Sequence, residues 1–119
     1  MAQSNHMGRL AEDMKREVID IIGKMKDPRL VGLITVTRVE VTSDLDVAKV
    51  SISVLGGGDD APAKAVEALN HAAGHVRSEI AKRMHIRKSP AFRFIEDDGA
   101  AYAAHINKIL GDLQDDGTH

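Results

Sequence analysis

The sequence predicts an α+β fold in a single domain, because helical and strand patterns follow one another in the order helix, two strands, two abutting helices and strand. Two observations support this prediction most directly. Two runs with strand alternation are separated by a short polar turn at 42–46, and a later helical pattern is interrupted by Gly74. The chain of 119 residues is long enough for one compact domain with a modest core.

The first predicted element is an amphipathic helix over about 7–25, where apolar residues recur every three or four positions. Pro28 disfavours helical geometry at Asp27, so the helix should end before a turn at 26–29. Residues 1–6 carry no such pattern, and we expect them to be a flexible N-terminus.

The next two elements are predicted strands. A strand over 33–41 changes parity after Val36, which predicts a bulge near Thr37 and Arg38. A second strand over 48–54 alternates apolar and polar residues and should have one wet face. Three of its residues are expected in the core: Val50, Ile52 and Val54.

A helical pattern then continues from Ala63 to about His85 and contains Gly74, which costs about 1 kcal/mol relative to alanine in a helix interior. We therefore expect a bend that lets two helices pack on one three-stranded sheet; a glycine with only a packing role is the alternative. A strand should follow over 90–96. The residues expected to face inward are Val66, Leu69, Ala73, Val76, Ile80 and Met84.

The charges are unevenly distributed, although the net charge is only −2. Residues 77–93 hold six basic side chains and one acid, and residues 94–119 hold six acids and one lysine. A local basic segment attracts a polyanion, whereas a solvated helix face is the simpler explanation. At about 100° per residue, Arg77 and Arg83 flank opposite sides of the apolar face, so not all the cations can reach one groove.

Composition argues against catalysis and against a membrane protein. The absence of cysteine excludes disulfides and thiol chemistry, and no apolar run approaches the roughly 20 residues of a membrane span. The glycine run at 56–58 lacks the lysine and hydroxyl residue of a phosphate loop. His71 and His75 have zinc-compatible spacing, but the bend should separate them. We expect a cytoplasmic, non-enzymatic protein without metal, cofactor or small-molecule substrate.

These segments together resemble the ribosome-binding factor A family over nearly the whole chain. The matching motifs are Arg9–Ala11, the turn Lys26–Leu30, Ser43–Leu45 with Ala48–Val50, the bend Ala72–Gly74 with Val76 and Arg77, and Pro90, Phe92, Phe94 and Asp97. The resemblance implies a type II KH-like domain, here residues 7–113, in which an Ala-x-Gly kink at Ala72 and Gly74 replaces the Gly-x-x-Gly loop of true KH domains.

The resemblance also implies a function. Members of the family bind the free 30S subunit and assist late maturation and 5′-end processing of 16S rRNA, with a link to growth in the cold. We expect a monomer that contacts rRNA through basic side chains, which would position it without reading sequence. The candidate rRNA-binding residues are Lys26, Arg29, Arg77, Arg83, Arg87, Lys88 and Arg93.

The C-terminal segment leaves a second class of function open. Apolar residues from Tyr102 to Leu113 recur at helical spacing, which predicts a closing helix on the domain, followed by a short flexible tail at 114–119. The acidic segment could instead meet a basic ribosomal protein, so that the chain would be a protein-interaction module. A metal hydrolase built on His71 and His75 is the third possibility.

Overall fold

The computed structural model describes residues 2–97 and residue 99. Its elements follow the predicted order. They are α1 (Ala2–Lys24), β1 (Leu33–Val41), β2 (Val47–Leu55), α2 (Ala61–His71), α3 (Ala73–Met84) and β3 (Ala91–Glu96). Helix α1 begins at Ala2, earlier than the start near Met7 that the apolar pattern predicted, and ends at Lys24. The predicted closing helix after Tyr102 lies outside the described residues.

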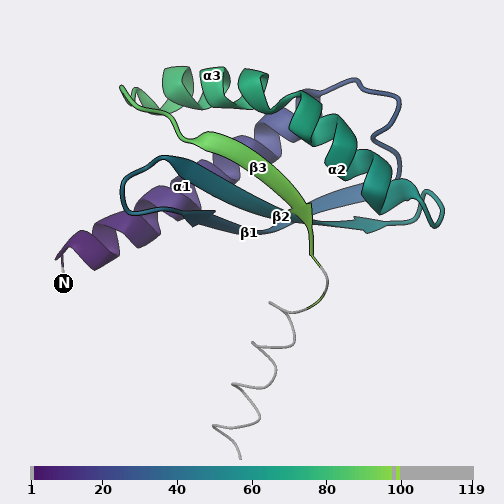
Figure 1. The fold of residues 1–119 in the computed structure, drawn as a ribbon, viewed down its shortest axis with the longest axis horizontal. Helices are drawn as coiled ribbons and strands as arrows, with labels where there is room; N and C mark the ends of the chain where they lie inside the picture. The colour runs from purple at the N-terminus through teal and green to yellow at the C-terminus, as the bar shows by residue number, and fades with distance from the viewer. Residues whose placement is uncertain (1, 98, 100–119) are drawn as a thin grey trace, which may run out of the picture.

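The three strands form one sheet in the order β1-β2-β3. Strands β1 and β2 are antiparallel, as a short turn requires, and β2 and β3 are parallel because the chain crosses over through α2 and α3. The register shifts between Val36 and Arg38, which confirms the predicted bulge. Figure 1 shows the helices on one side of this sheet, so the fold has two layers.

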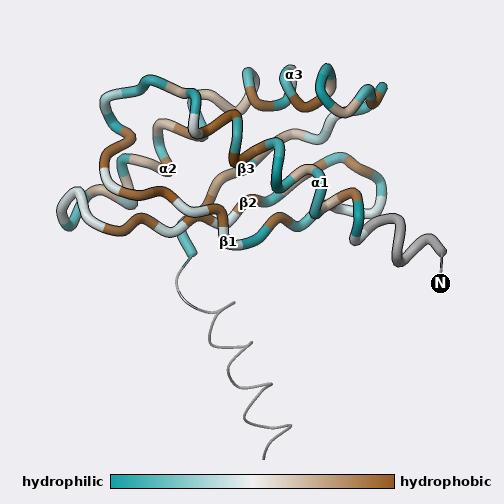
Figure 2. The backbone as a smooth tube through the Cα atoms, turned by 180° about the vertical axis from the view of Figure 1, so that it is seen from behind, coloured by the Kyte–Doolittle hydropathy of each residue, from teal (hydrophilic) through white to brown (hydrophobic). Residues whose placement is uncertain are grey.

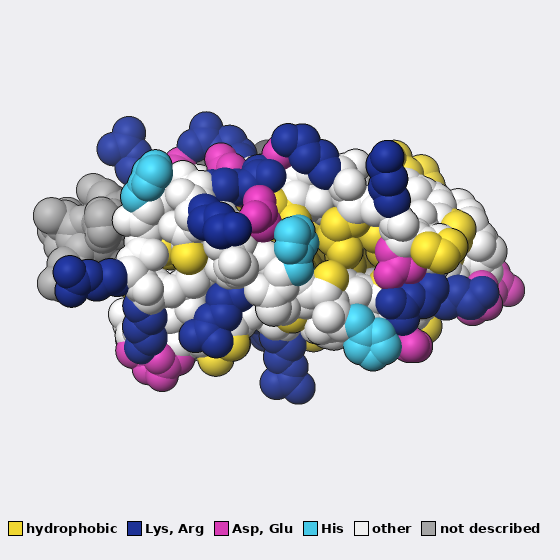
Figure 3. All heavy atoms as spheres, turned by 90° about the horizontal axis from the view of Figure 1, so that it is seen from above, with side chains coloured by type: hydrophobic (Ala, Val, Ile, Leu, Met, Phe, Trp, Pro, Cys, Tyr) yellow, Lys and Arg dark blue, Asp and Glu magenta, His cyan; other side chains and the backbone are white. Residues whose placement is uncertain are grey.

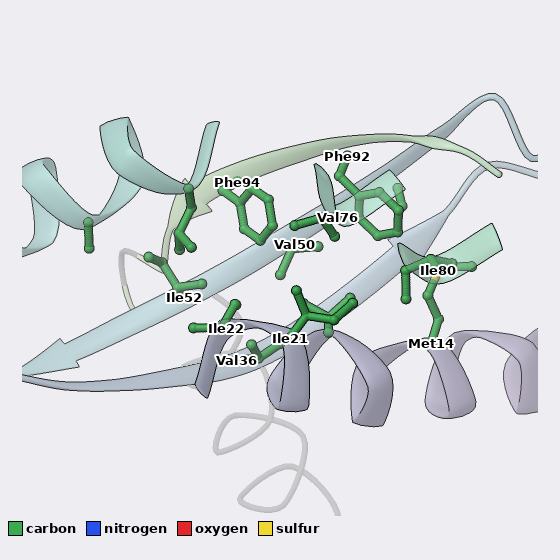
Figure 4. Close-up of a cluster of buried hydrophobic side chains, with 14 residues drawn as sticks. Met14, Ile21, Ile22, Val36, Val50, Ile52, Val76, Ile80, Phe92 and Phe94 are labelled. Atoms are coloured by element: carbon green, nitrogen blue, oxygen red, sulfur yellow. The ribbon is translucent and has the colours of Figure 1, made fainter. Parts of the chain in front are cut away.

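The core lies between the sheet and the helices. Figure 4 shows Ile21 and Ile22 of α1 pointing toward Val50 and Ile52 of β2, and Met14 of α1 pointing toward Ile80 of α3. The predicted burial of Val50 and Ile52 is complete. Val54 is only half-buried because it lies near the end of the sheet, and Val66 is half-buried on α2. Both aromatic residues of β3, Phe92 and Phe94, are buried and fill the space under α2 and α3.

Each end of α3 has a distinct local cause. At its start, Ala72 has non-helical backbone angles and separates α3 from α2. At its end, His85 adopts the left-handed conformation (φ 53°, ψ 42°) and terminates α3. The amide of Ile86 then donates to the carbonyl oxygen of Ala81 at 3.2 Å. This termination agrees with the predicted end near His85 and leaves Arg87 and Lys88 on a loop. None of the helices within the described ranges is long and apolar enough to cross a membrane.

Candidate nucleic-acid interface

The bend between α2 and α3 lies at Ala72. Its backbone angles (φ −92°, ψ 6°) depart from helical values, and its amide is shared between the carbonyl oxygens of Ala68 and Leu69, each at 3.1 Å. The helical pattern thus continues through two helices, as predicted. Gly74 is not the hinge itself; it lies in the first turn of α3.

The surroundings of Gly74 overturn the packing explanation for this glycine. A Cβ atom placed on Gly74 would have no heavy atom within 4 Å outside its own helix backbone and its neighbours in the chain. Its φ is not in the left-handed region, so its backbone does not require glycine. The missing side chain therefore leaves open space above the first turn of α3.

A shallow hollow of about 440 Å³ opens beside this glycine. We call it the kink hollow; it is lined by Gly74, Arg77, Ser78, Ala81, Arg87, Lys88 and Ser89. No acidic residue lines it. Figure 3 looks onto the helical side of the molecule and shows Lys and Arg side chains gathered over the half that α3 occupies. Two chain segments, α3 and the loop before β3, thus place three cations around one opening.

Reciprocal hydrogen bonds hold that loop against α3. The Nε of Arg77 donates to the carbonyl oxygen of Ser89 at 2.9 Å, and the Oγ of Ser89 donates to the carbonyl oxygen of Arg77 at 2.8 Å. Ser89 is buried, which is unusual for serine and protects both bonds from water. Arg87 and Lys88 come directly before Ser89, so the same bonds bring them to Arg77.

The cations of the kink hollow differ in their partners. Among the residues that the structure describes, Arg77 and Arg87 form no ion pair. Lys88 pairs with Asp46 in the turn between β1 and β2, where both side chains are more than half exposed. An exposed pair of this kind is weak, so Lys88 can exchange Asp46 for a phosphate at small cost.

Arg83 lies outside the kink hollow and is fully engaged. Its guanidinium contacts Asp20 at 2.6 Å and Glu17 at 3.3 Å on α1, and Glu79 at 3.5 Å on α3. The hydrogen bond to Asp20 raises the pKa of Arg83, and the same bond lowers the pKa of Asp20. Arg83 therefore ties α3 to α1, and its side chain is only 25% exposed.

Lys26 and Arg29 lie in the turn after α1, away from the kink hollow. Arg29 pairs with Asp27 at 2.9 Å and approaches Glu67 at 3.5 Å. Its Nη1 is 3.1 Å from Nδ1 of His71, the residue directly before the bend. The hydrogen bond from Arg29 lowers the pKa of Asp27. Arg29 thus fastens this turn to the end of α2, while Lys26 is exposed.

Arg93 lies on the other face of the sheet. It alternates with the buried Phe92 and Phe94 on β3 and is exposed beside Lys49 of β2, its partner in the register. Since the helices cover the face that Phe92 and Phe94 point into, Arg93 and the kink hollow cannot contact one flat surface at the same time. The predicted basic set is therefore divided among the hollow, the open face of the sheet, two ion-pair networks and, for Lys26, the exposed turn after α1.

The histidine pair does not form a metal site in the described part of the chain. No group of three potential metal-ligating side chains occurs there, and the bend at Ala72 separates His71 from His75. His71 instead contacts Arg29.

Two residues that contact the cations of the hollow were not identified from the sequence. Ser89 was considered only as the residue before Pro90, and Asp46 only as part of a turn. The available signal for Ser89 was its position between the basic pair Arg87–Lys88 and Pro90. A serine hydroxyl can fix a loop by a hydrogen bond to the backbone, and a loop that holds cations in place needs such a bond.

Comparison with known proteins identifies the family. The model of the family described as ribosome-binding factor A matches residues 6–110. The chain belongs to this family. Ribosome-binding factor A from Clostridium novyi is 40% identical over 110 residues, which cover 92% of this chain and 90% of that protein. Its counterpart from Acetivibrio thermocellus is 42% identical over 105 residues, covering 87% and 85% of the two chains.

Solved structures of ribosome-binding factor A share the fold. The Thermotoga maritima protein, a putative ribosome-binding factor A solved by NMR, is 33% identical with a TM-score of 0.69, covering 77% of this chain and 87% of that one. The Thermus thermophilus crystal structure is 27% identical with a TM-score of 0.67, covering 76% and 93%. The α+β, KH-like architecture is thereby confirmed. Ribosome-binding factor A is a non-enzymatic family, in agreement with the expectation of no catalysis.

Proposed function

We propose that this protein is a ribosome assembly factor that binds the free 30S subunit by placing the kink hollow against 16S rRNA. The assignment of this interface rests on one observation, the open space over Gly74 that is bordered by Arg77, Arg87 and Lys88. In support of the partner, a homology model of the Thermus thermophilus ribosome-binding factor A, fitted into the map of a 30S complex, has a TM-score of 0.63 and 26% identity to this chain. It covers 76% of this chain and 94% of that one.

The hollow suits a phosphate backbone better than a base. Arginine guanidinium groups bind phosphate oxygens through paired hydrogen bonds, and a helix without a side chain at Gly74 allows a backbone to approach closely. Within the described residues, stacking of unpaired bases is disfavoured, because the aromatic residues there, Phe92 and Phe94, are buried under α2 and α3. The domain therefore binds a shaped part of folded rRNA rather than a sequence in a single strand.

On this proposal, the protein acts in the cytoplasm as a monomer and assists late maturation and 5′-end processing of 16S rRNA, most visibly during growth in the cold. The rRNA role can be tested in cells whose own copy is replaced by the double variant Arg87→Glu/Lys88→Glu. These cells should accumulate 16S rRNA with unprocessed 5′ ends, and the defect should be larger in the cold. Normal processing at all temperatures, with the variant present at normal level, would contradict the proposal.

Binding is tested by cosedimentation with free small subunits, large subunits and assembled ribosomes at two salt concentrations. Arg87→Glu/Lys88→Glu should weaken binding to free small subunits by at least about tenfold and flatten its salt dependence, because two phosphate contacts are lost. Binding of the unaltered chain to all three particles alike would remove the 30S assignment.

The matched control is Lys49→Glu/Arg93→Glu, which makes the same change of charge on the open face of the sheet. This control should retain most of its affinity if the kink hollow is the interface. A larger loss in the control than in the hollow variant would move the interface to the sheet. A complex that survives RNase digestion would favour the protein-interaction class over rRNA binding.

A further inference from the structure

Large apolar side chains are exposed at the end of the sheet where β1 begins and β2 ends. Leu33 and Leu55 are direct partners in the register, yet they are 64% and 73% exposed. Ile19 of α1 and Val31, just before β1, are also exposed, at 46% and 39%. In Figure 2 the start of β1 and the end of β2 are coloured hydrophobic. Clustered apolar exposure of this kind marks a contact surface.

A cavity of about 510 Å³ adjoins these residues, between the end of α1 and the start of β1. No charged side chain lines it. Its apolar lining comes mainly from Ile19, Ile22, Met25, Leu30, Leu33 and Ile34. We call Leu33, Leu55, Val31 and this cavity together the β1-end surface.

The chain leaves β3 at the same end of the molecule. Because β3 runs parallel to β2 and Glu96 pairs with Ile52, the last residues of β3 lie beside the end of β2. Gly99 then has a φ of +87° and its amide donates to the carboxylate of Asp97 at 2.9 Å, so the chain turns instead of extending the strand. The end of β3 and the β1-end surface are therefore at the same end of the sheet.

Length permits a direct connection. The distance from the end of β3 to Leu33 is about three residues along the sheet and two strand spacings across it, or roughly 14 Å. The six steps from Glu96 to Tyr102 span at most about 20 Å, which exceeds this distance and leaves room for the turn at Gly99. A helix over 102–113 would be about 18 Å long. Its apolar residues recur at helical spacing and are Tyr102, Ile106, Ile109, Leu110 and Leu113.

We propose that residues 102–113 form an amphipathic helix whose apolar side docks on the β1-end surface of the same molecule. A tethered segment has an effective concentration in the millimolar range, which favours it over a second copy at ordinary protein concentration. The charge is also consistent, since residues 94–119 carry six acids and one lysine and are repelled by RNA. Docking here holds these acids at the end of the sheet opposite the loop that carries Arg87 and Lys88.

Paramagnetic broadening tests this contact in the full chain. The protein has no cysteine, so Gly111→Cys provides one attachment point for a spin label. We expect the label to broaden the methyl signals of Ile19, Leu33 and Leu55. The signals of Val41 and Met84, at the other end of the sheet and of α3, should stay sharp.

The control carries the same label together with Ile106→Asp/Ile109→Asp, which removes the apolar side and leaves the domain unchanged. Broadening should disappear in this control. Broadening that is absent in the first protein, or that persists in the control, would overturn the proposal. So would broadening that appears only between molecules, in a mixture of spin-labelled and isotope-labelled chains, because that result would assign the surface to a second copy.

Discussion

Arg77 and Arg83 are six residues apart on α3, yet their surroundings are opposite. Arg77 is exposed and borders the kink hollow, and within the described residues its guanidinium donates only to the carbonyl oxygen of Ser89. Arg83 is three-quarters covered and surrounded by Glu17, Asp20 and Glu79. The difference shows that a basic segment is not an interface by its charge alone. A cation such as Arg83 is unavailable to RNA because acids of the same protein already surround it.

The largest expected effect separates these two arginines. Arg77→Ala should lower affinity for free 30S subunits by about tenfold, as loss of a charge-assisted hydrogen bond predicts. Arg83→Ala should change affinity by less than about twofold but lower the free energy of unfolding, because three carboxylates lose their shared cation. Cosedimentation and urea unfolding of both variants measure the two effects. Equal losses of affinity would show that Arg77 and Arg83 contribute equally to 30S binding.

Ser89→Ala tests whether the loop must be held against α3 for Arg77, Arg87 and Lys88 to act together. It removes the hydrogen bond from the Oγ of Ser89 to Arg77, which should cost about 1 kcal/mol of stability. The loop with Arg87 and Lys88 should also become more mobile, so 30S affinity should fall by a few fold, about as much as 1 kcal/mol predicts. Amide exchange of residues 86–89 reports the mobility. Ser43→Ala, at an exposed turn position, is the control. Unaltered exchange in Ser89→Ala would show that the bond does not hold the loop.

Gly74→Ala should have opposite effects on folding and binding. Alanine favours a helix over glycine, so unfolding should require about 0.5–1 kcal/mol more free energy. The added methyl group would occupy the space that the proposed rRNA contact needs, and 30S affinity should decrease. Gly23→Ala is a matched control, because Gly23 is near the end of α1 and also has no neighbour within 4 Å of an added Cβ. If Gly74→Ala binds as well as the unaltered chain, the open space is not used.

The smallest effect concerns pH and the acids around Arg83. The hydrogen bond from Arg83, followed by that from Lys24, lowers the pKa of Asp20 below its ordinary value of 3.8. A lowered folded-state pKa contributes stability above the unfolded value, and this contribution is lost as the pH falls through the folded value. The fall in stability between about pH 5 and pH 3 should therefore be smaller in Arg83→Met than in the unaltered chain. Urea unfolding at both pH values measures the free energy of unfolding, and an identical fall in the two proteins would exclude a role for the pair of Arg83 and Asp20.

Much of the fold could be predicted from local patterns. The alternation of apolar and polar residues in β1 changes parity after Val36. The bulge follows because a strand must keep its apolar residues on the buried face. Pro90 and the residues before it predicted the end of α3 near His85, since proline restricts the residue that precedes it. The half-burial of Val54 was not predictable, because its position relative to the sheet end depends on how far the neighbouring strands extend.

By itself, the sequence determined the order of the elements, the apolar faces, the interruption near Gly74 and the family, because these depend on neighbours within a few residues or on short motifs. Only the tertiary structure decided which cations remain available. Arg83 meets acids from α1 that are more than 60 residues away along the chain, and Ser89 brings Arg87 and Lys88 to Arg77. Such contacts arise when separate helices and loops pack together, and packing between distant segments leaves no period or spacing that a sequence pattern could reveal.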